Sequence, residues 1–278
     1  MKKVIFVVLG IFALAAAYPV LFLLAGSLMG KQELAGYLSP VLAKGDGYAA
    51  FRLFPMYPTL RAYVELLLDS PGYFVMFWNS CFQVIPTILG QLLVGVPAAW
   101  SFARFAFKGK RALFILYIIL MVMPFQVTMV SGYLVLNKFH IMDTHLAIIL
   151  PGIFSTFPVF IMVKFFKAIP EELIEAAKLD GAGYMSTFIK IGIPLGNSGI
   201  VSAIVLSYLE NWNAIEQPLT FIRDKSKWPL SLYLPQISSD RVGVAFIASV
   251  IMMLPALLIF LSGQTYLEQG IVASGIKQ

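Results

Sequence analysis

Six long apolar segments constrain this chain more than any other feature of its sequence. They cover residues 4–28, 73–102, 112–136, 146–163, 195–215 and 244–262. A helix needs about 20 residues to cross the hydrocarbon of a bilayer, and these runs are too long, and alternate too little, for barrel strands. Only 12% of the residues are charged, against 59% that are hydrophobic, which excludes a soluble globular domain. The sequence therefore predicts an all-α, polytopic membrane protein with six transmembrane helices.

The first apolar segment begins like a secretory signal peptide. Lys2 and Lys3 precede it, and the three alanines at 15–17 resemble a cleavage site. The apolar run continues to Met29, however, whereas a signal peptide has roughly 7–15 apolar residues. An uncleaved first transmembrane helix is the better interpretation.

Lysine and arginine are unevenly divided between the two sides of these helices. If the N-terminus is cytosolic, that side holds 11 bases and 5 acids, while the other side holds nine of each. The densest cluster, from Arg104 to Arg111, lies in a short loop, where the positive-inside rule is most reliable. Both termini are therefore expected in the cytosol. The bases flank lipid-embedded segments and form no patch interleaved with aromatic residues, so we expect no nucleic-acid partner.

Few residues are suited to catalysis or metal binding. Cys81 is the single cysteine, and His140 and His145 share one short loop without clustered thiols or carboxylates. The sequence offers no plausible nucleophile–base pair and no G-x-x-x-x-G-K-[ST] loop for a nucleotide phosphate. We therefore expect no catalytic residue, no metal site and no cofactor in this chain.

Polar residues recur every fourth position in the second apolar segment, at Asn79, Gln83, Thr87 and Gln91. This spacing places them along one slowly drifting stripe of a helix. Because amides are costly in lipid, the stripe should face protein or water. Two interpretations stay open, namely hydrogen bonding between helices and the polar wall of a transport pathway.

A second polar group follows the apolar run of the fifth segment and contains Glu210, Asn211, Trp212 and Asn213. An indole can stack on a pyranose face while amides bond to sugar hydroxyls. The same mixture is typical of the interfacial belt of a membrane protein. Asn211, Trp212 and Asn213 are therefore candidates for a sugar pathway, with the belt as the alternative.

A polar stretch between two membrane segments covers residues 169–194. Pro170 suits the first turn of a helix, and Glu171 and Glu172 favour the positive end of the helix dipole. The helix-forming run ends at Leu179, and Gly181 suits a left-handed turn just beyond it. A second helix is expected over residues 184–191, where it presents Phe188 and Ile189.

The first of these two helices has an apolar face formed by Leu173, Ile174 and Ala177. Such a helix could rest on lipid, but interfacial helices usually carry a basic polar face and large anchoring side chains. This helix instead opens with glutamates and has small alanines at its centre, which let another protein approach closely. We favour docking of the apolar face into a groove on a partner protein.

Four stretches of the sequence resemble those of the permease subunits of type I ABC importers, in the carbohydrate-uptake branch with maltose-type permeases. The most specific is the EAA-type stretch that begins at Glu175-Ala176-Ala177 and ends at Pro194. The other three are Pro58-Thr59-Leu60-Arg61-Ala62-Tyr63 followed by Asn79-Ser80, Ala103-Arg104-Phe105-Ala106-Phe107-Lys108-Gly109-Lys110, and Trp212-Asn213 followed by Pro218-Leu219. Together they extend over nearly the whole chain.

The resemblance implies a fold, a location and a set of partners. The fold is that of a type I ABC importer permease in a bacterial plasma (inner) membrane. The implied partners are a second homologous permease, two ATP-binding subunits that hold ATP and Mg²⁺, and an extracytoplasmic solute-binding protein. The residues implied in coupling to the ATPase are Glu171, Glu172, Leu173, Ile174, Glu175, Ala176, Ala177, Asp180, Gly181 and Ala182. Glu175 would meet a basic residue of the ATPase, and Gly181 would preserve the turn.

The expected organisation has three parts. Residues 1–72 hold the first transmembrane helix and an extracytoplasmic loop, residues 73–268 form a core of five helices with the coupling loop at 169–194, and residues 269–278 form a short cytosolic tail. The predicted function is ATP-driven, binding-protein-dependent import of a sugar or oligosaccharide. An ABC permease for an amino acid, a peptide or a polyol phosphate is one alternative. A secondary transporter is another, but its expected buried acids are represented only by Glu210 and Glu216, near a segment end.

Overall fold

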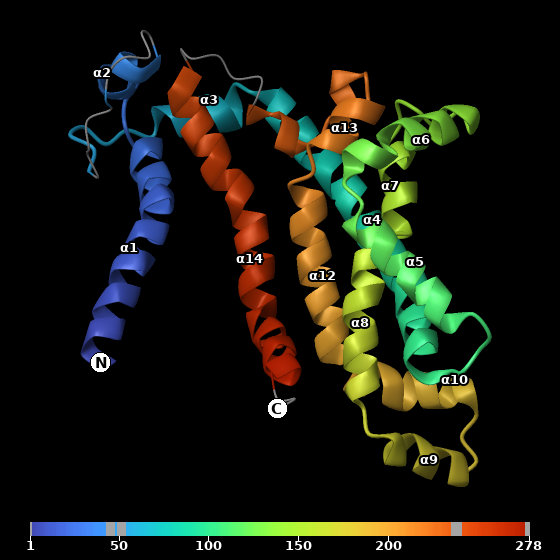
Figure 1. The fold of residues 1–278 in the computed structure, drawn as a ribbon. Helices are drawn as coiled ribbons and strands as arrows, with labels where there is room; N and C mark the ends of the chain where they lie inside the picture. Colours follow the sequence, from blue (N-terminus) through green and yellow to red (C-terminus); the bar gives the residue numbers. More distant parts are fainter. Residues whose placement is uncertain (1, 43–47, 49–53, 235–240, 276–278) are drawn as a thin grey trace. The chain divides into compact units, whose positions relative to one another are not determined.

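The computed structural model describes residues 2–42, 48, 54–234 and 241–275. All regular structure in these residues is helical, with no strand among them (Figure 1). The chain divides into two compact units. The first comprises Met1–Met76 with Leu232–Pro255, and the second comprises Phe77–Ser231 with Ala256–Gln278.

The first unit contains α1 (Lys2–Ser27), α2 (Lys31–Leu42), α3 (Arg61–Leu68) and the N-terminal parts of α4 (Pro71–Arg104) and α14 (Val242–Gly275). Met29, Leu34 and Phe246 form its small core. The hydroxyls of Ser27 and Tyr63 are 2.8 Å apart and tie α3 to the end of α1. Most of α1 exposes its apolar side chains, as a lipid-facing helix does.

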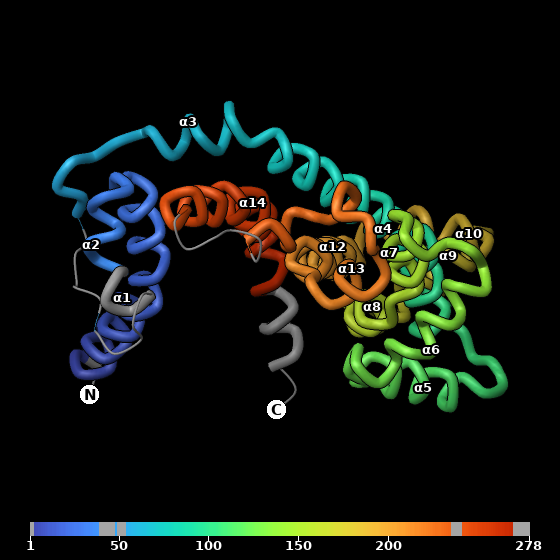
Figure 2. Tube along the Cα trace, turned by 90° about the horizontal axis from the view of Figure 1, so that it is seen from above, coloured from blue at the N-terminus to red at the C-terminus, as the bar shows by residue number. Residues whose placement is uncertain are grey.

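The second unit contains the rest of α4 and α14 and most of the other helices. In chain order these are α5 (Lys110–Val122), α6 (Phe125–Lys138), α7 (Leu146–Ile153), α8 (Thr156–Ala168), α9 (Glu171–Leu179), α10 (Tyr184–Thr187), a π-helical turn (Phe188–Gly192), α11 (Ile193–Leu195), α12 (Asn197–Trp212) and α13 (Glu216–Phe221), followed by 3₁₀ turns at Lys225–Lys227 and Leu230–Leu232. Seen from above, α4, α7, α8 and α12 of this unit are grouped together, with α5 and α6 along their side (Figure 2).

Aromatic side chains and close glycine contacts hold α4, α8 and α12 together. The core of this group includes Trp100 of α4 and Phe166 of α8, whose rings meet edge to face at a centroid distance of 5.4 Å. A Cβ atom placed on Gly196 would lie 2.2 Å from Phe166, and one on Gly199 would lie 2.6 Å from Phe165. Glycine at these two positions therefore permits the close packing of α8 against α12.

Four of the expected membrane segments are single spans by length and composition, namely Lys3–Ser27, Pro71–Arg104, Leu146–Ala168 and Val242–Glu268. The other two are bent pairs. Helices α5 and α6 meet at 102°, and the helical segment Tyr184–Leu195 meets α12 at 68°. The described residues therefore contain six spans only if each bent pair counts as one.

The bend between α5 and α6 differs from the single helix expected over 112–136. Met123, which precedes Pro124, has extended backbone angles of −65° and 123°, since a proline disfavours the helical conformation of the residue before it. The fifth segment was expected from residue 195, but its helix begins at Asn197, after the break at Gly196. Helix α14 continues to Gly275, and residues 276–278 lie outside the described part, so the cytosolic tail expected at 269–278 stays a prediction.

Gly196→Ala should destabilise the second unit, because the new methyl group would collide with Phe166 and with the carbonyl of Gly192. Overpacking of this kind costs about 1–3 kcal/mol. The measurement is thermal unfolding of the purified chain in one detergent. Gly10→Ala is the matched control, because a Cβ there has no neighbour within 4 Å. Equal unfolding temperatures for the two variants would contradict the packing described here.

Candidate functional site

The polar segment expected at 169–194 begins with a short joint between α8 and α9. Ile169 and Pro170 are both extended, with angles of −66° and 128° and of −56° and 136°. Glu171 and Glu172 then occupy the first turn of α9, and Lys178 lies in its last turn. The two glutamates complement the positive end of the helix dipole, as the sequence predicted, and Lys178 complements its negative end.

Gly181 ends α9 in the left-handed turn that the sequence predicted, with φ of 80°. Its N–H donates to the carbonyl of Lys178 at 3.0 Å, and the N–H of Ala182 donates to the carbonyl of Ala177 at 2.9 Å. This pair of bonds is a Schellman motif, which satisfies the last carbonyls of a helix. The turn therefore directs the chain into α10.

The apolar face of α9 is largely buried in this chain, whereas the sequence analysis expected it to be free to dock on a partner protein. Ile174 and Ala177 are 5% and 9% exposed, and Ile174 packs into the core of the chain itself with α4 and α8. The expected docking face of Leu173, Ile174 and Ala177 is therefore wrong for two of its three members. Residues three apart share one face of a helix, and that face lies against this chain.

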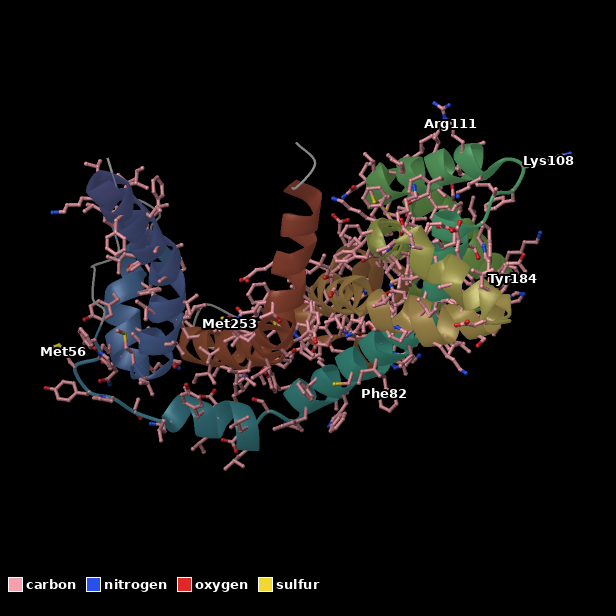
Figure 3. All side chains as sticks on the ribbon, turned by 90° about the horizontal axis from the view of Figure 1, so that it is seen from below. Met56, Phe82, Lys108, Arg111, Tyr184 and Met253 are labelled. Atoms are coloured by element: carbon pink, nitrogen blue, oxygen red, sulfur yellow. The ribbon has the colours of Figure 1, made fainter. Side chains whose placement is uncertain are left out.

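The outward face of α9 carries most of the expected coupling residues. Its exposed members are Glu171, Glu172, Leu173, Glu175, Ala176 and Asp180, with Gly181 exposed in the turn and Ala182 half-buried. Leu179, which the sequence reasoning did not select, is 89% exposed. Lys108, Arg111 and Tyr184 also point outward from the second unit (Figure 3). A mixed surface of acids, alanine and two leucines thus faces away from the chain.

Arg104, at the end of α4, connects to both sides of the α8–α9 joint. One guanidinium nitrogen, Nη1, lies 2.7 Å from Oε2 of Glu171. The other, Nη2, donates to the carbonyls of Phe166, at 2.6 Å, and Ile169. The sequence indicated a role for Arg104 in topology and placed it in one of the four stretches that resemble importer permeases, but sequence spacing gives no sign of a contact across 67 positions. A cavity of about 250 Å³ beside it is lined by Trp100, Lys178, Tyr184 and Thr187 among others.

The polar stripe on α4 is buried, as expected for amides that avoid lipid. Asn79, Gln83, Thr87 and Gln91 are 8%, 3%, 0% and 4% exposed. Asn79 Nδ2 donates to the carbonyls of Ser226 and Trp228 at 2.7 and 3.0 Å, and Gln83 Nε2 donates to the carbonyl of Lys227 at 3.1 Å. Thr87 donates to the carbonyl of Gln83 in its own helix. These contacts favour hydrogen bonding between segments as the role of Asn79 and Gln83.

His145 takes part in the same group. Burial, together with nearby Lys227, lowers the pKa of its imidazole, so the ring is neutral at pH 7. Neutral Nδ1 can then accept a hydrogen bond from Nε2 of Gln83, which lies 3.1 Å away. The neutral imidazole of His145 therefore stabilises the folded chain at pH values above the ordinary pKa of histidine. This stabilisation is lost as the pH falls through the lowered pKa of His145 in the folded chain.

Asp143 anchors the loop that follows α13, a role that the sequence reasoning missed. Its Oδ1 accepts hydrogen bonds from the backbone N–H groups of Asp224 and Arg223 at 2.8 and 2.9 Å. These bonds, first that from Asp224, hold the pKa of Asp143 below its usual range, with Lys227 adding to the effect. Asp143 has φ of 60°, a conformation that aspartate tolerates better than most residues. An Asp in a short loop is too common a pattern to identify such an anchor.

A larger cavity, of about 780 Å³, lies among α4, α5, α6, α7, α12 and α13 of the second unit. Its polar lining includes Gln91, Glu210, Asn211 and Gln217, and its apolar lining includes methionines and phenylalanines of α5, α6 and neighbouring segments. Gln91 Nε2 donates to the carbonyl of Gly152 at 2.9 Å, at the edge of this space. The structure therefore brings together Gln91 of the expected stripe and Asn211 of the expected sugar group.

Trp212 does not lie on this cavity, contrary to the expectation that its indole could stack on a sugar. It is 2% exposed. Tyr208 stacks on it at a centroid distance of 5.4 Å, and Phe77 meets it edge to face at 5.9 Å. Asn213 is exposed and bonds to the carbonyl of Leu209 in the last turn of α12. In this conformation the indole is a core side chain.

Comparison with known proteins gives one family. The family described as "Binding-protein-dependent transport system inner membrane component" matches residues 91–273. The chain is 28% identical to the arabinooligosaccharides transport system permease protein AraQ of Bacillus subtilis, over 94% of this chain and 90% of that protein. It is 29% identical to the lactose transport system permease protein LacG of Rhizobium radiobacter, over 72% of this chain and 74% of that protein.

The fold is also found in solved structures. One of them is a bacterial ABC transporter involved in the import of the acidic polysaccharide alginate, and the alignment covers 95% of this chain and 95% of the matched chain. The TM-score is 0.80 and the sequence identity is 20%. This likeness confirms the expected fold class, a helical membrane protein of the importer-permease type.

Asp143→Ala should loosen the loop at 222–228, because two backbone N–H groups would lose their acceptor. An amide left without its acceptor costs free energy, although less in a partly exposed loop than in a buried one. The measurement is the rate of tryptic cleavage at exposed Lys225, expected to rise several-fold. Asp69→Ala, at an exposed aspartate after α3, is the control. An unchanged cleavage rate in Asp143→Ala would refute the anchor.

Proposed function

Because the chain belongs to the family of binding-protein-dependent transport system inner membrane components, we propose that it is the permease subunit of an ATP-driven importer for a sugar or oligosaccharide. Relatives named for arabinooligosaccharides and for lactose support the sugar class. The sequence contains no nucleotide-binding loop, which supports the proposal that partner chains bind ATP and Mg²⁺. Family membership favours this function over an ion-driven secondary transporter.

The observation that carries the proposal is the position of α9. One face of the helix is fixed to the core through Ile174 and Ala177, and the opposite face exposes Glu172, Glu175 and Leu179. A lipid-resting helix would turn its apolar side chains toward the bilayer, but two of those on α9 pack inside the chain. The exposed acidic face is available to another protein, and a basic cleft on an ATP-binding subunit would complement its charge.

The proposed assembly has two permeases, two ATP-binding subunits and an extracytoplasmic solute-binding protein. Both termini of this chain and α9 lie on the cytosolic side, in agreement with the clustered bases from Arg104 to Arg111. Closure of the ATP-binding subunits moves the docked α9 helices, and each core follows. The path then opens outward to accept sugar, and hydrolysis resets it inward. Two packed states with different affinities for the ligands are sufficient for this cycle.

The larger cavity is the proposed wall of the sugar path. Amide groups of Gln91, Asn211 and Gln217 offer both donors and acceptors, which match sugar hydroxyls. The carboxylate of Glu210 adds an acceptor at the same end. Methionine and phenylalanine side chains supply the apolar surface on which the carbon face of a sugar can lie. The second permease would close the opposite side.

Glu175→Lys should uncouple ATP hydrolysis from transport while leaving the protein in the membrane. The side chain is exposed, so the substitution should leave the fold intact, whereas a reversed charge at a protein interface costs several kcal/mol. In the importer reconstituted in liposomes, sugar uptake should fall about tenfold or more. Glu268→Lys, which makes the same change at an exposed position of α14, should transport normally.

Gly181→Arg should give the same uncoupled behaviour for a conformational reason. A side chain with φ of 80° is strained by about 1–2 kcal/mol, so the turn after α9 would reorganise although the space around it is open. Membrane insertion should be normal and uptake should fall. Normal uptake with normal ATPase stimulation in both Glu175→Lys and Gly181→Arg would refute the coupling role of α9.

Asn211→Leu tests the sugar path. The substitution removes one amide from the cavity wall, and loss of a single hydrogen bond of about 1 kcal/mol should raise the half-saturating sugar concentration about fivefold. Asn137→Leu, at an exposed position of α6 that does not line the cavity, is the matched control. Identical dependence of transport on sugar concentration in the two variants would contradict the proposal that this cavity lines the sugar path.

A further inference from the structure

Arg104 is the only side chain of α4 that hydrogen-bonds to the α8–α9 joint among the contacts of the described residues. Its side chain is 9% exposed. Two of its three acceptors are the carbonyls of Phe166 and Ile169 at the end of α8, and the third is the carboxylate of Glu171 at the start of α9. One guanidinium group therefore holds the facing ends of two helices.

The chemistry of these acceptors suits a guanidinium group. The last carbonyls of a helix lack partners within it, and the negative end of the helix dipole attracts a cation. The planar guanidinium fork donates in several fixed directions at once, which an ammonium group cannot reproduce. The face of Trp100 lies 5.8 Å from Cζ and covers one side of the group.

The joint itself has little else to fix its angle. Ile169 and Pro170 are extended, and proline has no N–H to donate. A change of the angle would separate Arg104 from Glu171 or from the carbonyls, and a buried charge left without partners is costly. Nε of Arg104 is already buried without a hydrogen-bond partner in the described structure, so any further lost hydrogen bond adds to the cost of a donor that is unsatisfied already.

We propose that Arg104 is a positioning residue that fixes the angle between α8 and α9, so that α9, α8 and the end of α4 move as one body. This inference rests on the proposed coupling role of α9 and names the group that transmits its displacement into the core. Without Arg104, α9 still docks, but part of its movement is absorbed by bending at Ile169 and Pro170. A role in stability alone would leave the coupling of an assembled importer unchanged.

The first experiment needs only this chain, in lipid nanodiscs. Spin labels on cysteines at two exposed positions, Lys164 of α8 and Ala176 of α9, in a Cys81→Ser background, report the distance across the joint. Arg104→Lys is the test variant, and Glu171→Gln, which keeps the carbonyl contacts, is a milder second variant in case the first does not fold. Lys108→Gln is the control for a change at a nearby basic position that makes none of these contacts, because Lys108 is exposed in the loop after α4.

The distance distribution should be narrow in the unsubstituted chain and in Lys108→Gln, broad in Arg104→Lys, and intermediate in Glu171→Gln. The double variant Arg104→Glu with Glu171→Arg separates two explanations. If a simple ion pair fixed the joint, the exchanged charges would restore the narrow distribution. Because the two carbonyls of α8 also need a donor, we expect no restoration. A narrow distribution in Arg104→Lys, or full restoration by the exchange, overturns the proposal.

The second experiment uses the complete importer in liposomes and measures ATP consumed per sugar transported. This ratio should rise roughly tenfold in Arg104→Lys, as expected from the loss of about one charge-assisted hydrogen bond, and should stay unchanged in Lys108→Gln. A lower yield of complex with an unchanged ratio would make Arg104 a stability residue and overturn the proposal. If the unsubstituted complex does not import sugar with ATP, the proposed function fails instead. The spin-label result still tests whether Arg104 fixes the angle between α8 and α9.

Discussion

A lipid bilayer supplies no hydrogen-bond partners to a protein backbone, and the structure of this chain depends on that constraint. Segments that cross hydrocarbon must satisfy their own N–H and C=O groups, which makes them helices. The apolar runs therefore have little conformational choice. Helix α9 is different, because its exposed charges keep it out of the hydrocarbon while Ile174 and Ala177 bind it to the membrane-embedded core. The chain thus holds a polar helix in a defined position against an apolar bundle.

Much of this arrangement could be predicted from local sequence. Apolar runs located the membrane helices, and Gly181 correctly indicated the left-handed end of α9, because both signals depend on nearest neighbours along the chain. Local sequence was a poorer guide to which side chains of α9 are buried and which are exposed. Leu173, Ile174 and Ala177 are all apolar, and only the packing of α4 and α8 decides that Ile174 and Ala177 turn inward. The bend at Pro124 required knowledge of whether a proline kinks or ends its helix.

In the candidate site, contacts between residues distant in the sequence decided the role of each predicted residue, and local sequence could not reveal them. Asn79, Gln83 and Gln91 were identified as polar residues on one stripe, but their partners are carbonyls 61 to 149 positions away. Those partners separate Asn79 and Gln83, which hold a loop, from Gln91, which borders the large cavity. Trp212 looked suited to sugar stacking until Tyr208 and Phe77 were found to cover it. The contacts of Arg104 and Asp143 gave no sequence signal, because their partners lie 62 to 81 positions away in the chain.

The account depends most on the claim that the outward face of α9 contacts an ATP-binding subunit. Photocrosslinking in native membranes tests it directly, with a benzophenone side chain placed at Glu172 or Leu179 on that face and, as a reference, at Val8 on the exposed surface of α1. We expect both α9 positions to crosslink to a nucleotide-binding protein during turnover, and Val8 to crosslink to none. Crosslinks from Glu172 and Leu179 to lipid alone would contradict the account.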